Sequence, residues 1–348
     1  MNNYIDPTRK LLFHADRIGQ IQNGEKPAPV NVEIDLSNRC SLGCADCHFR
    51  HTHTRGPWAR ERKVDTGDLM DTALALRIVG ELKDYGVRSI TWTGGGEPTL
   101  HPEFDKVIDA CPIDQGIYTH GGHIDTDRAA LLKRRMNWVY VSFDRADRVS
   151  YYRYKQADRF EAACAGVTNL VNADGKATIG LGFLLDADSW KDGPEMIRLG
   201  EMLGVDYVQF RPGILFDYRY PQRGPRNAEW VKPCADWLES VQNGKSILAD
   251  VERFWMYANW KEHGYPLCHW AQMQTVITPD GRVWTCVNRR GFEGDCTGDL
   301  NNESFADIWA RSGAYAVNEQ CRVMCRGHIP NMTLTDVIDG TNGHRSFI

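Results

Sequence analysis

The sequence has 348 residues, with 41 Lys and Arg against 46 Asp and Glu and a net charge of −5 at pH 7. This length allows a large core, and the acidic balance argues against a polycation that binds nucleic acid through overall charge. No apolar run reaches about eighteen residues and the N-terminus lacks an apolar core, so neither a membrane span nor a secretory signal is predicted. The 11 cysteines then indicate a reducing compartment and metal ligation, with the cytoplasm as the expected location.

The N-terminal part, residues 1–30, reads as a short helical lead-in from Arg9 to Gln22 followed by a loop. Polar and apolar side chains alternate in the next residues, 31–36, which predicts a half-buried strand. This strand runs into a CX3CX2C triplet, formed by Cys40, Cys44 and Cys47.

Three thiolates on one short loop can hold three irons of a cubic four-iron, four-sulfur cluster. The fourth iron is then open and can chelate a small molecule. The alternative is zinc, because three thiols with His48 or His51 would also make a tetrahedral site.

A cysteine triplet of this spacing just after a first strand resembles the hallmark of the radical S-adenosylmethionine (radical SAM) family. In that family the open iron binds the amino and carboxylate groups of SAM. One electron from the cluster then splits SAM into methionine and a 5′-deoxyadenosyl radical, which takes a hydrogen atom from the substrate. The resemblance implies SAM, a catalytic 4Fe–4S cluster on Cys40, Cys44 and Cys47, and a reductant such as flavodoxin or ferredoxin. The family usually has an aromatic residue at the position of Asp46, so Phe49 is expected to pack near the adenine instead.

A basic loop, residues 50–63, comes after the cysteines. It is either a solvated connector or a rim that attracts an anionic substrate. A helix is predicted next, from a cap at Asp65 or Thr66 to about Tyr85, and Gly86 ends it. The run VRSITW then reads as a second strand.

The loop after the second strand is TGGGEPTLHPEF. Glycine lets a ligand or a backbone approach closely, and a carboxylate beside it can accept hydrogen bonds from an ammonium group. The loop resembles the GGEP motif of radical SAM enzymes, carried here by Gly95, Gly96, Glu97 and Pro98. The resemblance implies that its backbone and carboxylate hold the amino group of SAM.

Four further strand-like runs follow, separated by helical patterns: QGIYTH, WVYVSF, ATIGLGFLL and DYVQFRP. Strand and helix therefore alternate about six times, which predicts parallel βαβ units. A full barrel needs about eight such units. The radical SAM family has a partial (β/α)6 barrel, which we expect over residues 31–212.

Sites in such barrels lie at the carboxyl ends of the strands. In relatives these positions approach SAM, which gives a set of candidate cofactor contacts: Thr119, Ser142, Asp144 and Gly182. His120 stands where the family often has Asn. His120 and Arg211 are candidate substrate contacts, and Arg211 suits a carboxylate, although capping or solvation would explain either residue equally well.

Residues 213–264 read as a turn-rich linker with two helical segments, before a cysteine-rich region at 265–330. There ITPDGRVWTC predicts two short strands around an Asp-Gly turn, and a helix over FADIWA would bring later cysteines back to it. Four thiolates would converge, as a closed cluster or a zinc site requires: Cys268, Cys286, Cys321 and Cys325.

The CX12GX4C opening of this region resembles the SPASM/Twitch extension of radical SAM enzymes. Few cysteines follow, which favours the shorter Twitch form with one auxiliary 4Fe–4S cluster. Cys296 is then either a spare buried thiol, which is the preferred interpretation, or an alternative ligand. A closed cluster has no corner for substrate, so we expect it to transfer electrons or to tune the nearby field. Electron transfer would make the net reaction an oxidation, and a redox-neutral isomerisation or an epimerisation is the alternative. Residues 331–348 are expected to form a mobile C-terminal tail.

The substrate expected from the sequence is a small, anionic molecule such as a sugar, a nucleoside or a modified amino acid. Peptide-modifying relatives often carry a leader-recognition domain, for which residues 1–30 leave no room. Modification of a nucleobase in DNA or RNA is the main rival, because aromatic and basic residues interleave in YYRYK (151–155) and DYRYPQR (217–223), although solvated surface is the plainer interpretation. The sequence is also compatible with a peptide maturase and with a non-enzymatic, zinc-stapled binding protein.

Overall fold

The computed structural model describes residues 6–45, 47, 68–213, 229–259, 263–317, 321 and 325–340. The predictions on Phe49, on the basic loop 50–63 and on the stretch 217–223 therefore lie outside the described residues. Within the described ranges, no helix is both long and apolar enough to span a bilayer.

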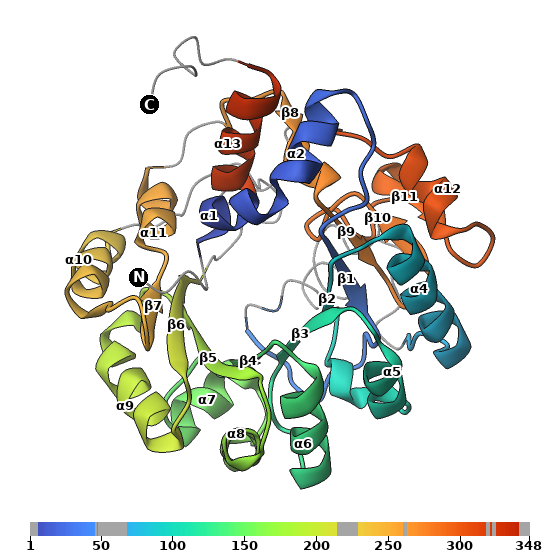
Figure 1. The fold of residues 1–348 in the computed structure, drawn as a ribbon. Coiled ribbons are helices and arrows are strands. Elements are labelled where there is room, and N and C mark those ends of the chain that lie inside the picture. Colours follow the sequence, from blue (N-terminus) through green and yellow to red (C-terminus); the bar gives the residue numbers. More distant parts are fainter. Residues whose placement is uncertain are drawn as a thin grey trace.

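The core of the fold is a curved sheet with helices along its outer side (Figure 1). From β1 to β6 each strand pairs in parallel with the next, which confirms the partial (β/α)6 barrel. The whole sheet has ten strands in the order β11-β10-β9-β1-β2-β3-β4-β5-β6-β7. Their bounds are β1 Asn31–Asp35, β2 Ser89–Thr93, β3 Asp114–Thr119, β4 Trp138–Ser142, β5 Thr178–Leu185, β6 Tyr207–Pro212, β7 Ile247–Ala249, β9 Gln274–Ile277, β10 Arg282–Trp284 and β11 Cys296–Asp299.

The predicted hairpin around the Asp-Gly turn is present as β9 and β10, but it does not form a sheet of its own. β9 pairs in parallel with β1, so the hairpin extends the barrel sheet at that edge. The barrel strands and the strands of this hairpin therefore belong to one sheet, although a linker was expected between them in the chain at 213–264. A separate two-stranded sheet joins β8 (Leu267–Cys268) to β12 (Tyr315–Ala316).

Alternate positions of the barrel strands differ sharply in polarity. Those that face the helices are apolar and buried: Val32, Ile34, Ile90, Trp92, Ile117, Val139, Val141, Ile179, Leu181, Phe183, Val208 and Phe210. The intervening positions point to the opposite face of the sheet. They are largely polar or aromatic, and they include Glu33, Asp35, Thr91, Tyr118, Tyr140, Ser142, Tyr207, Gln209 and Arg211. The fold thus offers a polar inner face on a rigid apolar shell.

The helices of the barrel are α4 Thr72–Tyr85, α5 Phe104–Ala110, α6 Thr126–Arg135, α7 Arg148–Lys155, α8 Phe160–Asn172 and α9 Gly193–Leu203. α4 begins later than the expected cap at Asp65 or Thr66. Asp71 caps it instead, because its carboxylate accepts a hydrogen bond of 2.9 Å from the Leu74 N–H. Gly86 ends the helix at φ 92°, as predicted. Two of the predicted helices follow the barrel, as α10 Val231–Val241 and α11 Val251–Ala258.

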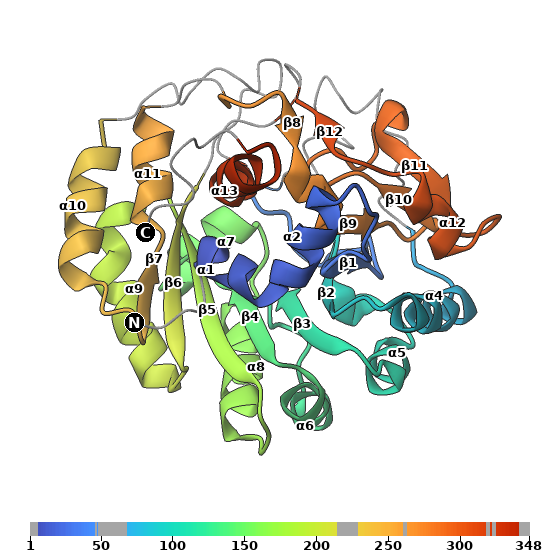
Figure 2. The same ribbon diagram turned by 45° about the horizontal axis from the view of Figure 1, so that its top comes forward.

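The prediction of a mobile tail over residues 331–348 is wrong for residues 331–338. These residues belong to α13 (His328–Ile338), which is a packed helix. Leu334 lies in a small core with Leu11, Ile21 and Met273. This core joins α13 to the N-terminal helices α1 (Pro7–Leu11) and α2 (Ala15–Gln22), which lie beside it in Figures 1 and 2. Between α1 and α2 runs the short helix η1 (Leu12–His14).

The stretch YYRYK, which the sequence suggested as a base-stacking surface, belongs to α7 and is mostly buried. Tyr151, Tyr154 and Lys155 are inside, and only Tyr152 and Arg153 are exposed. Two stretches suggested a polynucleotide substrate, and the prediction is wrong for YYRYK, the one that the structure describes. The buried end of this stretch contacts the cysteine loop instead.

Candidate active site and auxiliary metal pocket

The cysteine loop follows β1 and is held by the end of α7. The Gly43 N–H donates to the Lys155 carbonyl, and the Ala45 N–H donates to the Tyr154 carbonyl, each at 2.8 Å. Carbonyls in the last turn of a helix have no partner within the helix, so the loop satisfies them. The three thiols of this loop are Cys40, Cys44 and Cys47.

Two thiols of this loop, Cys40 and Cys44, need a metal to ionise. Burial raises the pKa of Cys40 to about 12, and it also raises the pKa of Cys44. Metal ligation requires thiolates, and a positive metal centre supplies the free energy that removes their protons. With Cys47, the loop has the three thiols that fit a cluster with one open iron.

The GGEP loop packs directly on the chain segment that leads into the cysteines. The Gly96 N–H donates to the Ser37 carbonyl at 3.0 Å, and the Glu97 N–H donates to the Arg39 carbonyl at 2.7 Å. A Cβ on Gly96 would lie 2.2 Å from that same Arg39 carbonyl oxygen. Glycine is therefore required here by backbone contact. Gly95 is buried beside it, and Pro98 opens the short helix η3 (Pro98–Leu100).

The carboxylate of Glu97 is saturated by protein donors. It accepts hydrogen bonds from the Thr99 hydroxyl at 2.6 Å, the Thr119 hydroxyl at 2.7 Å and the His120 N–H at 2.8 Å. Burial by itself would raise the pKa of Glu97, but the His120 ring beside it and these hydrogen bonds hold the pKa below its ordinary value. Glu97 thus ties β3 to the GGEP loop, and the expected contact of its carboxylate with SAM stays a prediction.

His120 contacts the cysteine loop. Its Nε2 lies 3.2 Å from the Ser41 hydroxyl, and Nε2 of His123 lies 3.0 Å from the same oxygen. Burial lowers the pKa of His120. The predicted substrate residue therefore sits against the loop between Cys40 and Cys44, where it can position the loop as well as meet a ligand.

The candidate contacts on β4 and β5 are engaged with the protein itself. Asp144 forms a buried ion pair with Lys155, whose ammonium also donates to the Ser142 carbonyl at 2.9 Å. A Cβ on Gly182 would lie 1.9 Å from the Tyr140 hydroxyl. The glycine therefore leaves space for the tyrosine side chain. This contact accounts for glycine at position 182 without an adenine beside it.

Arg211 stands on the inner face of β6, beyond the tyrosines. Its guanidinium lies 4.3 Å from the Tyr140 ring centroid and 5.7 Å from that of Tyr118. Its Nε is buried without a hydrogen-bond partner, and the same holds for Nε of Arg253 on α11. No carboxylate of the described residues forms an ion pair with Arg211, which suits contact with an anionic group.

Two arginines that sequence reasoning missed reach into the barrel from the C-terminal region. Arg290 pairs with Asp35 on β1 at 2.6 Å and contacts the Gly94 carbonyl, and Arg326 pairs with Glu33 on the same strand. Arg290 follows Cys286 by four residues, and Arg326 is adjacent to Cys325. The acids could be noticed in the sequence, because charged residues in a buried strand need partners.

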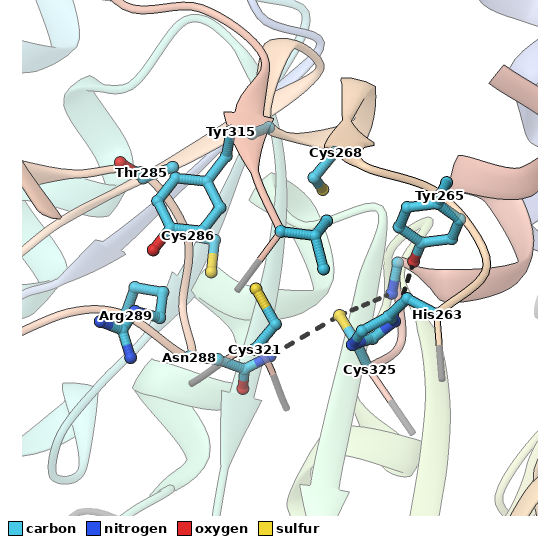
Figure 3. Close-up of a pocket in the computed structure, with 13 residues that line it drawn as sticks. His263, Tyr265, Cys268, Thr285, Cys286, Asn288, Arg289, Tyr315, Cys321 and Cys325 are labelled. Carbon is cyan, nitrogen blue, oxygen red and sulfur yellow. Dashed lines mark hydrogen bonds between the residues drawn. The ribbon is translucent and has the colours of Figure 1, made fainter. Parts of the chain in front are cut away.

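The four C-terminal cysteines chosen from the sequence line one pocket, and their sulfur atoms face a common space (Figure 3). Cys268 ends β8 and directly precedes η5 (His269–Gln272), and Cys286 follows β10. Cys321 and Cys325 precede α13, and neither is in a helix. The Gly327 N–H donates to the Cys325 sulfur at 3.3 Å. The helix expected over FADIWA is α12 (Phe305–Ala310).

Cys296 is absent from the residues that line this pocket. It starts β11, and its thiol donates to the Gly298 carbonyl at 3.4 Å. Its assignment as a spare thiol stays a prediction.

Four thiols around one pocket can supply the one thiolate per iron that a 4Fe–4S cluster needs. Four thiolates can also hold a zinc ion, so the thiols alone are compatible with either group.

Two family models match the sequence. The radical SAM superfamily matches residues 34–200, and the iron–sulfur cluster-binding SPASM domain matches residues 268–338. The first match spans the barrel and the cysteine loop, and the second spans the auxiliary pocket and α13.

Relatives and solved structures agree with these matches. A PqqA peptide cyclase of Methylobacterium sp. (strain 4-46) is 23% identical over 83% of this chain and 75% of the relative. A probable GTP 3′,8-cyclase of Methanocella arvoryzae is 30% identical over 34% of this chain and 35% of the relative. SuiB of Streptococcus suis bound to S-adenosylmethionine has a TM-score of 0.63 at 15% identity, over 90% of this chain and 73% of that chain. The complex of SuiB with its precursor peptide SuiA gives a TM-score of 0.62 at 14% identity, over 87% of this chain and 69% of that chain.

The radical SAM domain implies SAM and a 4Fe–4S cluster, and the SPASM domain implies auxiliary iron–sulfur ligation. A non-enzymatic zinc protein is therefore the wrong description. The chain belongs to the radical SAM superfamily and is an enzyme with a C-terminal SPASM domain.

Proposed function

We propose that the enzyme modifies a peptide, by abstraction of a hydrogen atom from one of its residues. Similarity to a peptide cyclase over most of the chain carries this proposal. The likeness of the fold to SuiB, solved with a precursor peptide, supports it. The relatives thus favour a peptide substrate over the small molecule expected from the sequence.

The inner face of the barrel supplies the substrate site in this proposal. Arg211 presents its guanidinium there, flanked by Tyr118 and Tyr140, and Arg253 on α11 forms an ion pair with Asp250. Such a surface suits a peptide with acidic and aromatic side chains, because guanidinium pairs with carboxylate and stacks on aromatic rings.

The cofactor is assigned to the carboxyl ends of β1 to β4, beside this face. Cys40, Cys44 and Cys47 would hold the cluster that, with SAM bound, supplies the radical. The backbone of Gly95 and Gly96, and the side chains at Thr119 and Ser142, stand at the adjoining strand ends. Cys268, Cys286, Cys321 and Cys325 would hold an auxiliary 4Fe–4S cluster, whose chemistry is to accept an electron from the substrate. An oxidative crosslink or dehydrogenation then becomes the expected outcome.

A deuterium-transfer experiment tests the peptide proposal. The anaerobically reconstituted enzyme, with SAM and dithionite, is incubated with deuterated synthetic peptides that contain acidic and aromatic residues. We expect deuterium in 5′-deoxyadenosine and loss of hydrogen from the peptide, both read by mass spectrometry. Product without deuterium, at the rate seen without peptide, would contradict the proposal.

A nucleotide is the second candidate, because the chain is also similar to a probable GTP 3′,8-cyclase over about a third of its length. Arg211 suits a phosphate group as well. A parallel incubation with GTP decides between the candidates, since only the true substrate class should stimulate 5′-deoxyadenosine formation.

A further inference from the structure

Lys155 is a buried charge that the SAM chemistry described above does not use. Its side chain is 2% exposed, although lysine is almost never fully buried without a partner. Its ammonium donates to the Asp144 carboxylate and to the Ser142 carbonyl. The ring centroids of Tyr151 and Tyr154 lie 6.0 and 5.5 Å from the ammonium nitrogen.

Asp144 is fixed as firmly as its partner. Its backbone has φ 69°, a left-handed conformation that is uncommon for a residue with a side chain. The Gly182 carbonyl accepts a hydrogen bond of 3.0 Å from the Asp144 N–H, and the carboxylate accepts one of 3.1 Å from the Leu184 N–H. The neighbouring strand β5 therefore orients the carboxylate toward Lys155.

The ion pair lies against the cysteine loop. The Lys155 carbonyl accepts the Gly43 N–H at 2.8 Å, so the same residue that carries the charge also holds the backbone next to Cys44. A buried ion pair contributes little to stability compared with apolar packing, so its position beside a cluster ligand points to a functional role.

We propose that Lys155 and Asp144 are a positioning pair that sets the reduction potential of the SAM-binding cluster. Lys155 holds the loop through its carbonyl, and its ammonium favours the reduced cluster, which carries one more negative charge. Asp144 orients the ammonium and offsets part of its charge. Charges act strongly here because the surroundings are dry. The inference rests on the radical SAM assignment and is independent of the substrate class.

A redox titration monitored by electron paramagnetic resonance tests the pair in the reconstituted, full-length holoenzyme. The SAM-binding cluster is recognised by the change that added SAM causes in its spectrum. The variants are Lys155→Met, Lys155→Arg and Asp144→Asn. Arg153→Met is the matched control, because it removes one positive charge from the exposed side of the same helix.

Lys155→Met and Asp144→Asn should shift the midpoint potential of the SAM-binding cluster in opposite directions. We expect a lower potential in Lys155→Met, a higher one in Asp144→Asn, and values near that of the wild type in Lys155→Arg and Arg153→Met. Unchanged potentials in both K155M and D144N would overturn the proposal. So would iron loss in all three pair variants with a normal potential in the protein that stays loaded, because that pattern shows a structural role alone.

Discussion

At the scale of single residues, close backbone contact explains which glycines the site requires. Gly96 touches the carbonyl of Arg39, while Gly182 leaves space for the Tyr140 ring. Both were singled out from the sequence as places of close approach. The sequence did not reveal that the approaching group is the protein itself.

Gly96→Ala should separate the GGEP loop from the cysteine loop. A Cβ 2.2 Å from a carbonyl oxygen cannot be accommodated without backbone movement, and overpacking of this kind costs about 1–3 kcal/mol. Gly80→Ala is the control, because no atom lies within 4 Å of its Cβ and it sits in α4. Alanine in that helix should stabilise by about 0.5–1 kcal/mol. Urea unfolding measures the change in the free energy of unfolding for both variants. Equal effects of Gly96→Ala and Gly80→Ala would contradict the close contact at Gly96.

The buried pair of Arg290 and Asp35 gives a second prediction at this scale. Arg290→Met leaves a buried carboxylate without its partner, which typically costs about 3–5 kcal/mol. The exposed pair of Arg134 and Asp109 serves as control, because surface pairs contribute about 0–1 kcal/mol. Denaturant midpoints of Arg290→Met and Arg134→Met should therefore differ clearly. A similar midpoint for the two variants would show that Asp35 finds other partners.

Local patterns in the sequence predict the cysteine ligands and the GGEP loop, because the expected ligand chemistry fixes residue type and spacing. They were not enough for the arginine pairs. Arg290 and Asp35 are 255 positions apart, and no local pattern joins them. Lys155 was misread for a related reason, since YYRYK looks like an exposed aromatic and basic surface until α7 is placed against the loop.

At the scale of elements, the sequence predicted the βαβ alternation well, because apolar and polar residues alternate with the period of strands and helices. Two of the described α-helices were missed, and so were the short strands β7, β8, β11 and β12. α7 was not predicted, because its sequence was interpreted as an aromatic and basic surface. α13 was taken for a tail, because its apolar residues are mixed with polar ones. Its burial depends on partners far away in the chain, α1 and α2.

The packing of α13 predicts a strong contrast between two of its apolar side chains. Leu334 is fully buried, whereas Met332 is 49% exposed. Leu334→Ala should cost about 2–5 kcal/mol through the cavity it leaves. Met332→Ala should stay within about 0.5 kcal/mol of the wild type. Thermal unfolding of both variants measures this difference in stability. If the segment were an unpacked tail, the two substitutions would change stability equally.

At the scale of the whole molecule, one strand links the two metal sites. β1 leads into the cysteine loop at its carboxyl end, and β9 of the C-terminal region pairs along its edge. The arginines that follow the auxiliary cysteines then anchor to the acids of β1. The SPASM region is thus built into the barrel, and this could not be predicted from separate local patterns.

The central claim is that the chain holds one catalytic and one auxiliary cluster, and iron content tests it most directly. Iron, sulfide and 5′-deoxyadenosine are measured after anaerobic reconstitution of the wild type and of the variants C40A/C44A and C268A/C286A. With four irons per cluster, we expect about eight irons per chain in the wild type and about four in each variant. Only C40A/C44A should lose 5′-deoxyadenosine. Zinc in place of iron, or iron content that is the same in all three proteins, would contradict the account.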